Sequence, residues 1–227
     1  MSISNIQSRA SSHAGDGFIH YVSWVCIAVP VLVVFIDLLV ILLNRGFSPL
    51  EHTISEFVLM NYGWIERTGL SLIGAALLLL GIVWFWYLGG KTDRSFHFAG
   101  LILVPLGLCF LLTAIFKVDG SELEHTTHGA IHRVATAIIA FVFPFFCLIV
   151  AWCLRNKHTL RLFALYSAFT CLMGLLNVGW GFFALASGQL PGLSERILTL
   201  INLIWLAIAG VQITRLTSGQ TPNANVL

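Results

Sequence analysis

The chain has 227 residues, of which 58% are hydrophobic and only 10% are charged. Because a soluble domain usually carries about 25% charged residues, this chain has too little polar surface to stay dissolved in water. Its net charge of +2 is small and no basic run accompanies it, which argues against nucleic acid as a partner. The composition therefore predicts an integral membrane protein whose surroundings are the lipid bilayer.

Six apolar segments are long enough, or nearly so, to cross a bilayer as helices. A hydrocarbon core about 30 Å thick needs about 20 helical residues, and hydrocarbon leaves free backbone groups without partners. The predicted spans are residues 19–43, 68–88, 96–116, 131–154, 162–186 and 197–213. They predict an all-α bundle of six transmembrane helices over residues 19–216, in which consecutive helices are antiparallel neighbours. Polar tails are expected at residues 1–18 and 217–227, the second of them disordered.

The positions of lysine and arginine predict the orientation. Seven of the twelve flank the side that holds the N-terminus, and five flank the other side. Since cytoplasmic loops carry an excess of these residues, both termini are expected in the cytoplasm, with the protein in the cell (inner) membrane. Seven of the ten acids and four of the eight histidines then fall on the outer side. Any chemistry is therefore expected at that side.

The loop after the first span predicts an amphipathic helix at the membrane interface, from Pro49 to about Met60. Ser48 can cap it, and a glutamate three residues later completes a capping box. The apolar face would hold Leu50, Ile54, Phe57 and Val58, and the polar face His52, Ser55 and Glu56. The polar face is either solvated or covers an outer cavity. The nearest base to Ser55 within this motif is His52.

Two histidines at the start of the fourth span have the spacing of a metal site. His128 and His132 are four residues apart and so share a helix face, with His125 on the same stripe. Neutral imidazoles at this spacing can bind zinc, and Asp119 at the end of the third span can be a third ligand or orient a histidine. The same histidines can instead cap or bond neighbouring loops. The sequence leaves both roles open.

Asp37 lies deep within the first predicted span. An acid in hydrocarbon is costly, so it must face the bundle interior or a wet cavity, and it is a candidate for ligand binding. The structural alternative is a hydrogen bond to a neighbouring helix through Asn177 or Asn202. Glu195 and Arg196 open the sixth span, where Arg196 either anchors at the interface or pairs across the loops.

The order of five short motifs resembles a known family. They are ISE and YGW after the first span, IFKVDG at the end of the third, HGAIH at the start of the fourth, and ER before the sixth. Together they resemble the prokaryotic six-span family described as domain of unknown function 998 (DUF 998), which is distantly similar to DRAM-like membrane proteins. The resemblance covers roughly residues 19–216 and implies six spans with a shared polar cluster, but no established reaction. Its positions carry over to Ser55, Glu56, Asp119, His128, His132, Glu195 and Arg196.

Two functions of different classes are compatible with these observations. The first is a non-enzymatic membrane protein that binds a lipid or small ligand at the outer face. In this hypothesis His52, Asp37 and Arg196 contact the ligand. It requires that loops distant in the sequence meet at one end of the bundle.

The second hypothesis is a zinc-dependent intramembrane hydrolase acting on a lipid. Asp119, His128 and His132 would hold the ion, and zinc would lower the pKa of a bound water. Glu56 or Glu195 would then be the general base, and Ser55 would bond the substrate carbonyl. This donor set resembles that of the membrane hydrolases of the ceramidase and progestin-receptor type.

Overall fold

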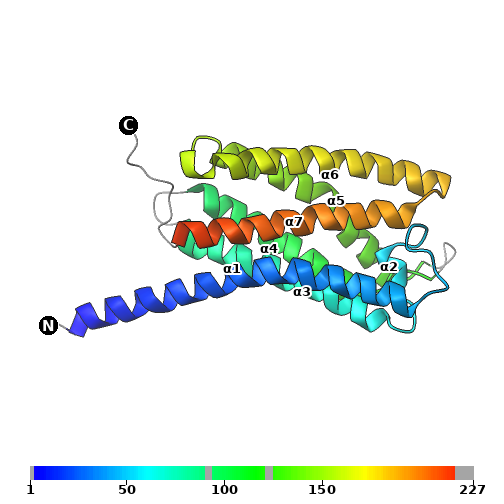
Figure 1. Cartoon of the computed structure of the whole chain (residues 1–227), viewed down its shortest axis with the longest axis horizontal. Coiled ribbons are helices and arrows are strands. Elements are labelled where there is room, and N and C mark those ends of the chain that lie inside the picture. Colours follow the sequence, from blue (N-terminus) through cyan, green and yellow to red (C-terminus); the bar gives the residue numbers. More distant parts are fainter. Residues whose placement is uncertain (1–2, 90–93, 121–124, 218–227) are drawn as a thin grey trace.

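The computed structural model describes residues 3–89, 94–120 and 125–217, with side chains described from Gly15 onward. Six helices in this part of the chain are long and apolar enough to cross a membrane, which confirms the predicted all-α membrane bundle (Figure 1). In chain order the elements are α1 Ile3–Leu43, α2 Ile54–Phe57, α3 Gly63–Ile82 with the π-helical continuation η1 Val83–Leu88, α4 Arg94–Ile115, α5 Thr127–Leu154, the 3₁₀ turn η2 His158–Leu160, α6 Arg161–Ser187 and α7 Pro191–Thr217.

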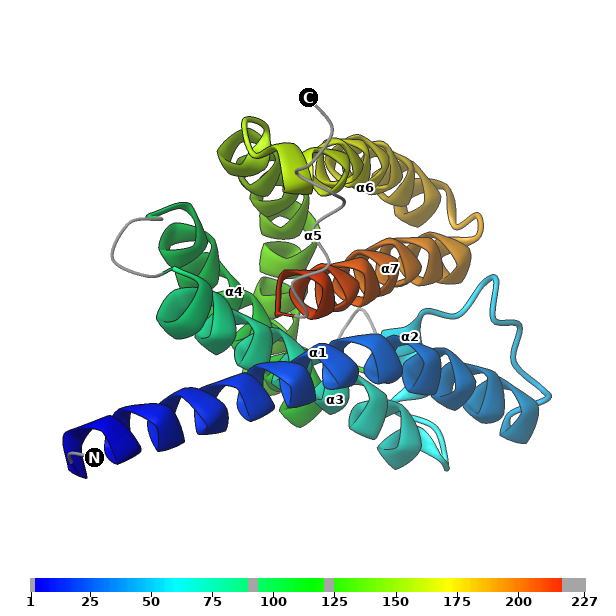
Figure 2. The same cartoon turned by 60° about the vertical axis from the view of Figure 1, so that its left-hand side comes forward.

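The helices form a closed ring in which each packs against its neighbours in the chain. The last helix, α7, lies between α6 and α1 and so closes the ring (Figure 2). The start of α1 and the end of α7 lie at one end, the termini end, and α2 lies at the opposite end, the α2 end (Figure 1). At the closure, the Ser23 hydroxyl of α1 donates to the Gly210 carbonyl of α7 over 2.8 Å. Such small and hydroxyl-bearing residues allow membrane helices to approach closely.

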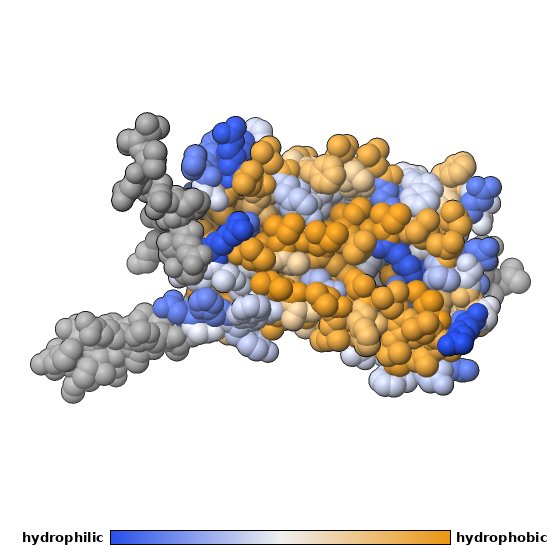
Figure 3. All heavy atoms as spheres, viewed as in Figure 1, coloured by the Kyte–Doolittle hydropathy of each residue, from blue (hydrophilic) through white to orange (hydrophobic). Residues whose placement is uncertain are grey.

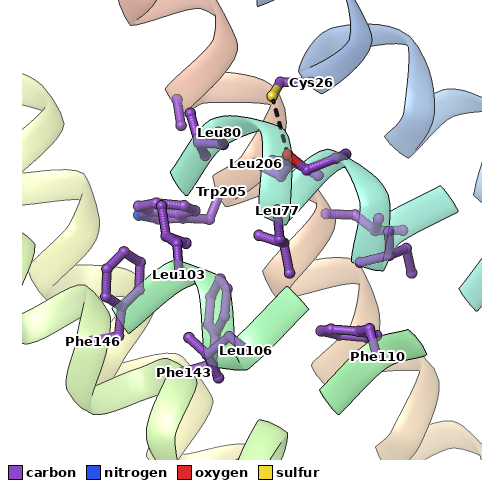
Figure 4. Packing of buried hydrophobic residues seen from close by; sticks show 14 of the residues in the cluster. Cys26, Leu77, Leu80, Leu103, Leu106, Phe110, Phe143, Phe146, Trp205 and Leu206 are labelled. Carbon is purple, nitrogen blue, oxygen red and sulfur yellow. Dashed lines mark hydrogen bonds between the residues drawn. The ribbon is translucent and has the colours of Figure 1, made fainter. Parts of the chain in front are cut away.

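Large aromatic rings fill the centre of the ring on the side of the termini end. The indole of Trp205 lies 5.2 Å from the Phe146 ring, 5.5 Å from Phe143 and 5.8 Å from Trp84, measured between ring centroids. Its Nε1–H donates to the Ser167 hydroxyl over 3.0 Å. Because four helices contribute to this cluster, it holds the bundle together through packing (Figure 4).

The outside of the ring is apolar, as a surface facing lipid must be. Figure 3 shows a hydrophobic band along the helices, with hydrophilic residues gathered toward both ends. Val31, Trp86 and Leu162 are 71%, 72% and 79% exposed there. One hydrophilic patch interrupts the band between α1 and α7, toward the α2 end (Figure 3). These two helices also carry Asp37 and Arg196.

The three long helices that begin at the α2 end each begin four to six residues before their predicted spans. α3, α5 and α7 begin at Gly63, Thr127 and Pro191, whereas the predicted spans begin at residues 68, 131 and 197. Capping explains the start of α5, because the Thr126 hydroxyl accepts from the Gly129 N–H over 3.0 Å. Polar residues expected in loops therefore lie in the first turns of helices.

The sequence predicted a polar tail at each end of the chain. At the N-terminus, α1 begins at Ile3, so its backbone is helical through the predicted polar tail. The predicted disordered C-terminal tail from Ser218 lies outside the described residues.

The interfacial helix exists between the first two spans, but its predicted extent from Pro49 to Met60 is wrong. Only Ile54–Phe57 is helical, and the cap is Thr53 rather than Ser48. Thr53 and Glu56 form the capping box, with the Thr53 N–H donating to Glu56 Oε2 over 2.6 Å. Ile54, Phe57 and Val58, which belong to the predicted apolar face, are buried. Leu50 precedes the helix and is 46% exposed.

Candidate functional site

Three helices bring Ser55, His132 and Glu195 together at the α2 end. The Ser55 Oγ lies 3.0 Å from His132 Nε2 and 2.9 Å from Glu195 Oε1. The other imidazole nitrogen, Nδ1, lies 2.8 Å from the Phe116 carbonyl oxygen. These residues come from α2, α5 and α7, and sequence distances of 77 and 140 residues separate Ser55 from its two partners. The base beside Ser55 is thus His132, whereas His52 lies 3.6 Å from Glu56 Oε2.

The hydrogen-bonding capacities in this chain determine how many protons it holds. A carbonyl only accepts, so His132 Nδ1 carries a proton that it donates to Phe116. The single Ser55 proton can go to either Nε2 or the Glu195 carboxylate, but not to both. All contacts are satisfied only when one further proton is present, on Nε2 or on the Glu195 carboxyl. Full satisfaction of these contacts therefore requires one proton more than a neutral imidazole, a serine hydroxyl and a carboxylate carry.

Arg196 joins α7 to α1 and to the loop between α1 and α2. Its Nε and Nη2 donate to the two carboxylate oxygens of Asp37, each over 3.2 Å. Its Nη1 donates to the carbonyls of Pro49 and His52 over 2.6 and 2.8 Å. Asp37 is therefore bonded to Arg196, and the expected bond to Asn177 or Asn202 is not the one formed. The Asn177 amide instead donates to the Ser194 carbonyl over 3.0 Å.

The loop lies so close to α7 that Gly192 has no room for a side chain. A Cβ at Gly192 would overlap the carbonyl oxygen of His52 and lie 2.6 Å from that of Pro49. The next residue along, Leu193, donates its backbone N–H to the Leu50 carbonyl over 3.1 Å. Residues 49–53 are therefore held against the start of α7 by backbone contacts as well as by Arg196.

Glu66 is a further acid inside this end of the bundle. It lies in the first turn of α3 and is only 2% exposed. Its Oε2 atom is buried without a hydrogen-bond partner. The charges of Asp37, Glu195 and Arg196 are all close enough to act on it. Three acids thus share this region with Arg196.

Asp119 lies at the edge of the site and stabilises the start of α5. Its Oδ1 accepts from the Thr126 hydroxyl and its Oδ2 from Arg133, each over 2.5 Å. These hydrogen bonds, the one from Thr126 above all, hold the pKa of the Asp119 carboxyl below its ordinary value. A Cβ at Gly129 would overlap this carboxylate, so glycine is required where the two segments meet. The two carboxylate oxygens of Asp119 are thus occupied by the cap residue Thr126 and by an ion pair with Arg133.

The remaining predicted residues lie apart from this chain of hydrogen bonds. His125 and His128 are exposed, and the His128 ring packs against Phe116 at a tilt, with 5.2 Å between centroids. His132 is 2% exposed. The two histidines of the HxxxH motif therefore point to different surroundings. Glu56 forms the capping box of α2 together with Thr53.

The predicted zinc ligands do not converge. Within residues 3–89, 94–120 and 125–217, no group of three or more histidine, cysteine, aspartate or glutamate side chains could hold a metal ion. Both nitrogens of His132 have partners in Ser55 and Phe116, and Asp119 is bound by Arg133. These residues do not fit a zinc ion in this arrangement.

Two members of the site were missed in the sequence. Glu66 was counted only as an outer acid because the predicted span began at residue 68, two residues after it. Its position in the first turn of α3 places it inside the bundle. The Phe116 carbonyl, which orients His132, is a backbone group. The residue type at position 116 therefore does not reveal it.

Comparison with known proteins identifies a family. The family model described as "Protein of unknown function (DUF998)" matches residues 26–212, a range that includes all the site residues. No curated protein and no solved structure matches the chain. The more distant likeness to DRAM-like proteins finds no support in these comparisons.

Proposed function

This chain belongs to the DUF998 family, whose function is unknown, and we propose that its α2 end binds a small ligand or lipid head group that carries an ammonium group. The observation that carries this proposal is the Glu66 carboxylate, which is 2% exposed with its Oε2 unpartnered. A buried carboxylate without a partner is costly, so it either takes up a proton or binds a donor that brings positive charge.

The charges around Glu66 favour a cation over an anion. Asp37 and Arg196 neutralise each other through two hydrogen bonds. The extra proton of the Ser55, His132 and Glu195 chain neutralises Glu195. Glu66 then remains as the one uncompensated acid among these groups.

An ammonium group fits this position better than a metal ion. A metal needs several protein donors that converge, and no such group exists among the described residues. An ammonium group needs one acceptor with charge and can take its other partners from backbone carbonyls. Because Glu66 is only 2% exposed, the ligand enters as segments around the start of α3 move apart.

The α2 end faces outward in this proposal. The Lys and Arg distribution supports an orientation in which both termini are cytoplasmic and the protein lies in the cell (inner) membrane. The ligand would then come from the outer leaflet or from the external solution.

Thermal unfolding of the purified protein tests the proposal. A ligand that binds only the folded state stabilises it by about 2.7 kcal/mol at 100 times its Kd. We expect the unfolding temperature to rise with ethanolamine in detergent, or with phosphatidylethanolamine in nanodiscs. The two arms distinguish a free amine from a lipid head group. Glycerol and phosphatidylglycerol are the matched probes without an ammonium group.

Two variants locate the binding site. Glu66→Gln should abolish the shift, because the amide keeps the shape of the side chain but loses its charge. Glu56→Gln is the matched control, since Glu56 lies on the exposed side of α2, and it should keep the shift. The proposal fails if neither ammonium probe stabilises the protein, or if Glu66→Gln responds as strongly as the wild type.

The zinc-dependent hydrolase has less support as an alternative. Its ligands would be Asp119, His128 and His132, which have other partners or lie apart. These side chains would have to give up those contacts and move together before they could hold the ion.

A further inference from the structure

The contacts of Ser55 have the pattern of an activated nucleophile. Nucleophilic serines lie within about 2.6–3.2 Å of a base, and a third group orients that base. Ser55 Oγ is 3.0 Å from His132 Nε2. The Phe116 carbonyl, 2.8 Å from Nδ1, fixes the imidazole so that its Nε2 is directed at the hydroxyl. Nucleophile, base and orienting group are therefore all present, without a metal.

The additional proton of this chain of hydrogen bonds allows a state in which the serine is ready to react. When that proton is on the Glu195 carboxyl, the carboxyl donates to Ser55 Oγ over 2.9 Å. The Ser55 hydroxyl must then donate to the neutral Nε2 of His132. The proton of the nucleophile is thus directed at its base, as general-base catalysis requires.

Apolar side chains around α2 indicate the kind of substrate. Phe47, Leu50, Leu59 and Trp64 are between 41% and 65% exposed, in the segments just before and after this helix. The α2 end lies where the hydrophobic band of the surface gives way to polar residues (Figure 3). A molecule with an acyl chain can therefore lie along these side chains and present its ester group at the level of Ser55, which is partly exposed.

We propose that Ser55 is a catalytic nucleophile that hydrolyses an acyl ester at the membrane surface, with His132 as its general base and without a metal ion. This proposal does not rest on the ammonium-binding function proposed above.

The reaction balances with water as the only co-substrate. Ser55 Oγ bonds to the acyl carbon while its proton passes to His132 Nε2. The ester C–O bond breaks, and the leaving alcohol oxygen takes that proton. Water then attacks the acyl carbon and gives a proton to Nε2. The acyl–Oγ bond breaks, the fatty acid leaves, and Oγ regains the proton.

A fluorophosphonate probe tests this proposal directly, because it bonds covalently only to activated serines. Purified full-length protein in detergent should react in a time-dependent manner, and peptide mass spectrometry should locate the adduct on Ser55. Ser55→Ala should lose the adduct. His132→Gln should slow the reaction at least about 100-fold, the usual lower bound for the contribution of a general base.

His128→Gln is the matched control, since it removes the exposed histidine of the same motif and should leave the rate unchanged. Circular dichroism and unfolding temperature show that each variant is folded, and Ser55→Cys with a thiol-reactive ester gives a second readout if Ser55→Ala unfolds. In that variant an acyl adduct should form at residue 55. Addition of a chelator should not change the rate. No adduct at Ser55 in the wild type, a wild-type rate in His132→Gln, or loss of reaction with chelator would each overturn the proposal.

Discussion

The half of the bundle near the termini is packed around Trp84 and Trp205, whereas the α2 half is joined by hydrogen bonds among acids, Arg196 and backbone carbonyls. In the aromatic half, contacts between rings such as Trp84, Trp205 and Phe143 join the helices. In the polar half, the contacts of Ser55 and Arg196 depend on partners from distant segments, and Glu66 Oε2 lacks a partner. The comparison teaches that the aromatic half depends on packing shared by the whole bundle, whereas the polar half depends on individual charge partners and can carry chemistry. Four changes test that division.

The largest effect is expected from Arg196→Met. The substitution leaves Asp37 without its partner and removes the donor to the carbonyls of Pro49 and His52. Breaking a buried ion pair from one side costs about 3 to 5 kcal/mol. We expect that loss in denaturant unfolding. Hydrogen exchange should increase in residues 44–57 and stay slow around Trp205.

The double variant Asp37→Leu with Arg196→Met sharpens this test. Removing both charges should recover part of the stability, because no unpaired acid remains. Recovery should be incomplete, since the two loop carbonyls still lack their donor. Full recovery would contradict the role of Arg196 in holding the loop.

Trp205→Ala should come next, at about 3 kcal/mol. The indole contacts rings from η1, α5 and α6, and its loss leaves a cavity that these rings cannot close. Here we expect faster hydrogen exchange throughout the bundle, in contrast to the local effect of Arg196→Met. A purely local effect would mean that this packing is not shared by the whole bundle.

Ser167→Ala should cost about 1 to 2 kcal/mol, because the Trp205 Nε1–H then stays buried without an acceptor. Thr170→Ala is the control on the same helix. Its hydroxyl donates only within α6, to the Tyr166 carbonyl over 2.9 Å. The two unfolding temperatures should therefore differ, with Ser167→Ala the lower. Equal unfolding temperatures would indicate that the hydrogen bond from the Trp205 indole to Ser167 does not stabilise the fold.

The smallest effect is expected from Asp119→Asn, and it should depend on pH. The folded pKa of Asp119 is lowered from its ordinary 3.8, chiefly by the hydrogen bond from Thr126. Its contribution is thus fully present above pH 3.8 and is lost as pH falls through the folded value. The stability difference between wild type and variant should be present at pH 7 and shrink toward pH 3. A difference that grows in acid would contradict the lowered pKa.

Much of the fold could be predicted because the bilayer imposes it. Each predicted span corresponds to one helix, since about 20 apolar residues have no other way to satisfy their backbone in lipid. The starts of α3, α5 and α7 were placed four to six residues late. Hydropathy locates the apolar run but not the capped polar turn before it. For the same reason, Glu66 was not recognised as a site residue.

Part of the site was also visible in the sequence. Ser55, His132 and Glu195 were all singled out and do meet at one end. Their pairing could not be predicted, because hydrogen-bond partners 77 and 140 residues apart depend on how the ring closes. The HxxxH spacing predicted a shared metal site for His128 and His132, but the two side chains have different surroundings. His128 stays exposed in the first turn of α5, whereas His132 is one turn further into the bundle.

Closure of the ring by α7 has a consequence for synthesis of the protein. Asp37 is made early, and its partner Arg196 follows 159 residues later. While the nascent chain enters the membrane, the first helix holds an acid that no other segment yet neutralises. Insertion of the last helix both supplies the counter-charge and seals the assembly, so a chain truncated before α7 should be held by the insertion machinery or degraded.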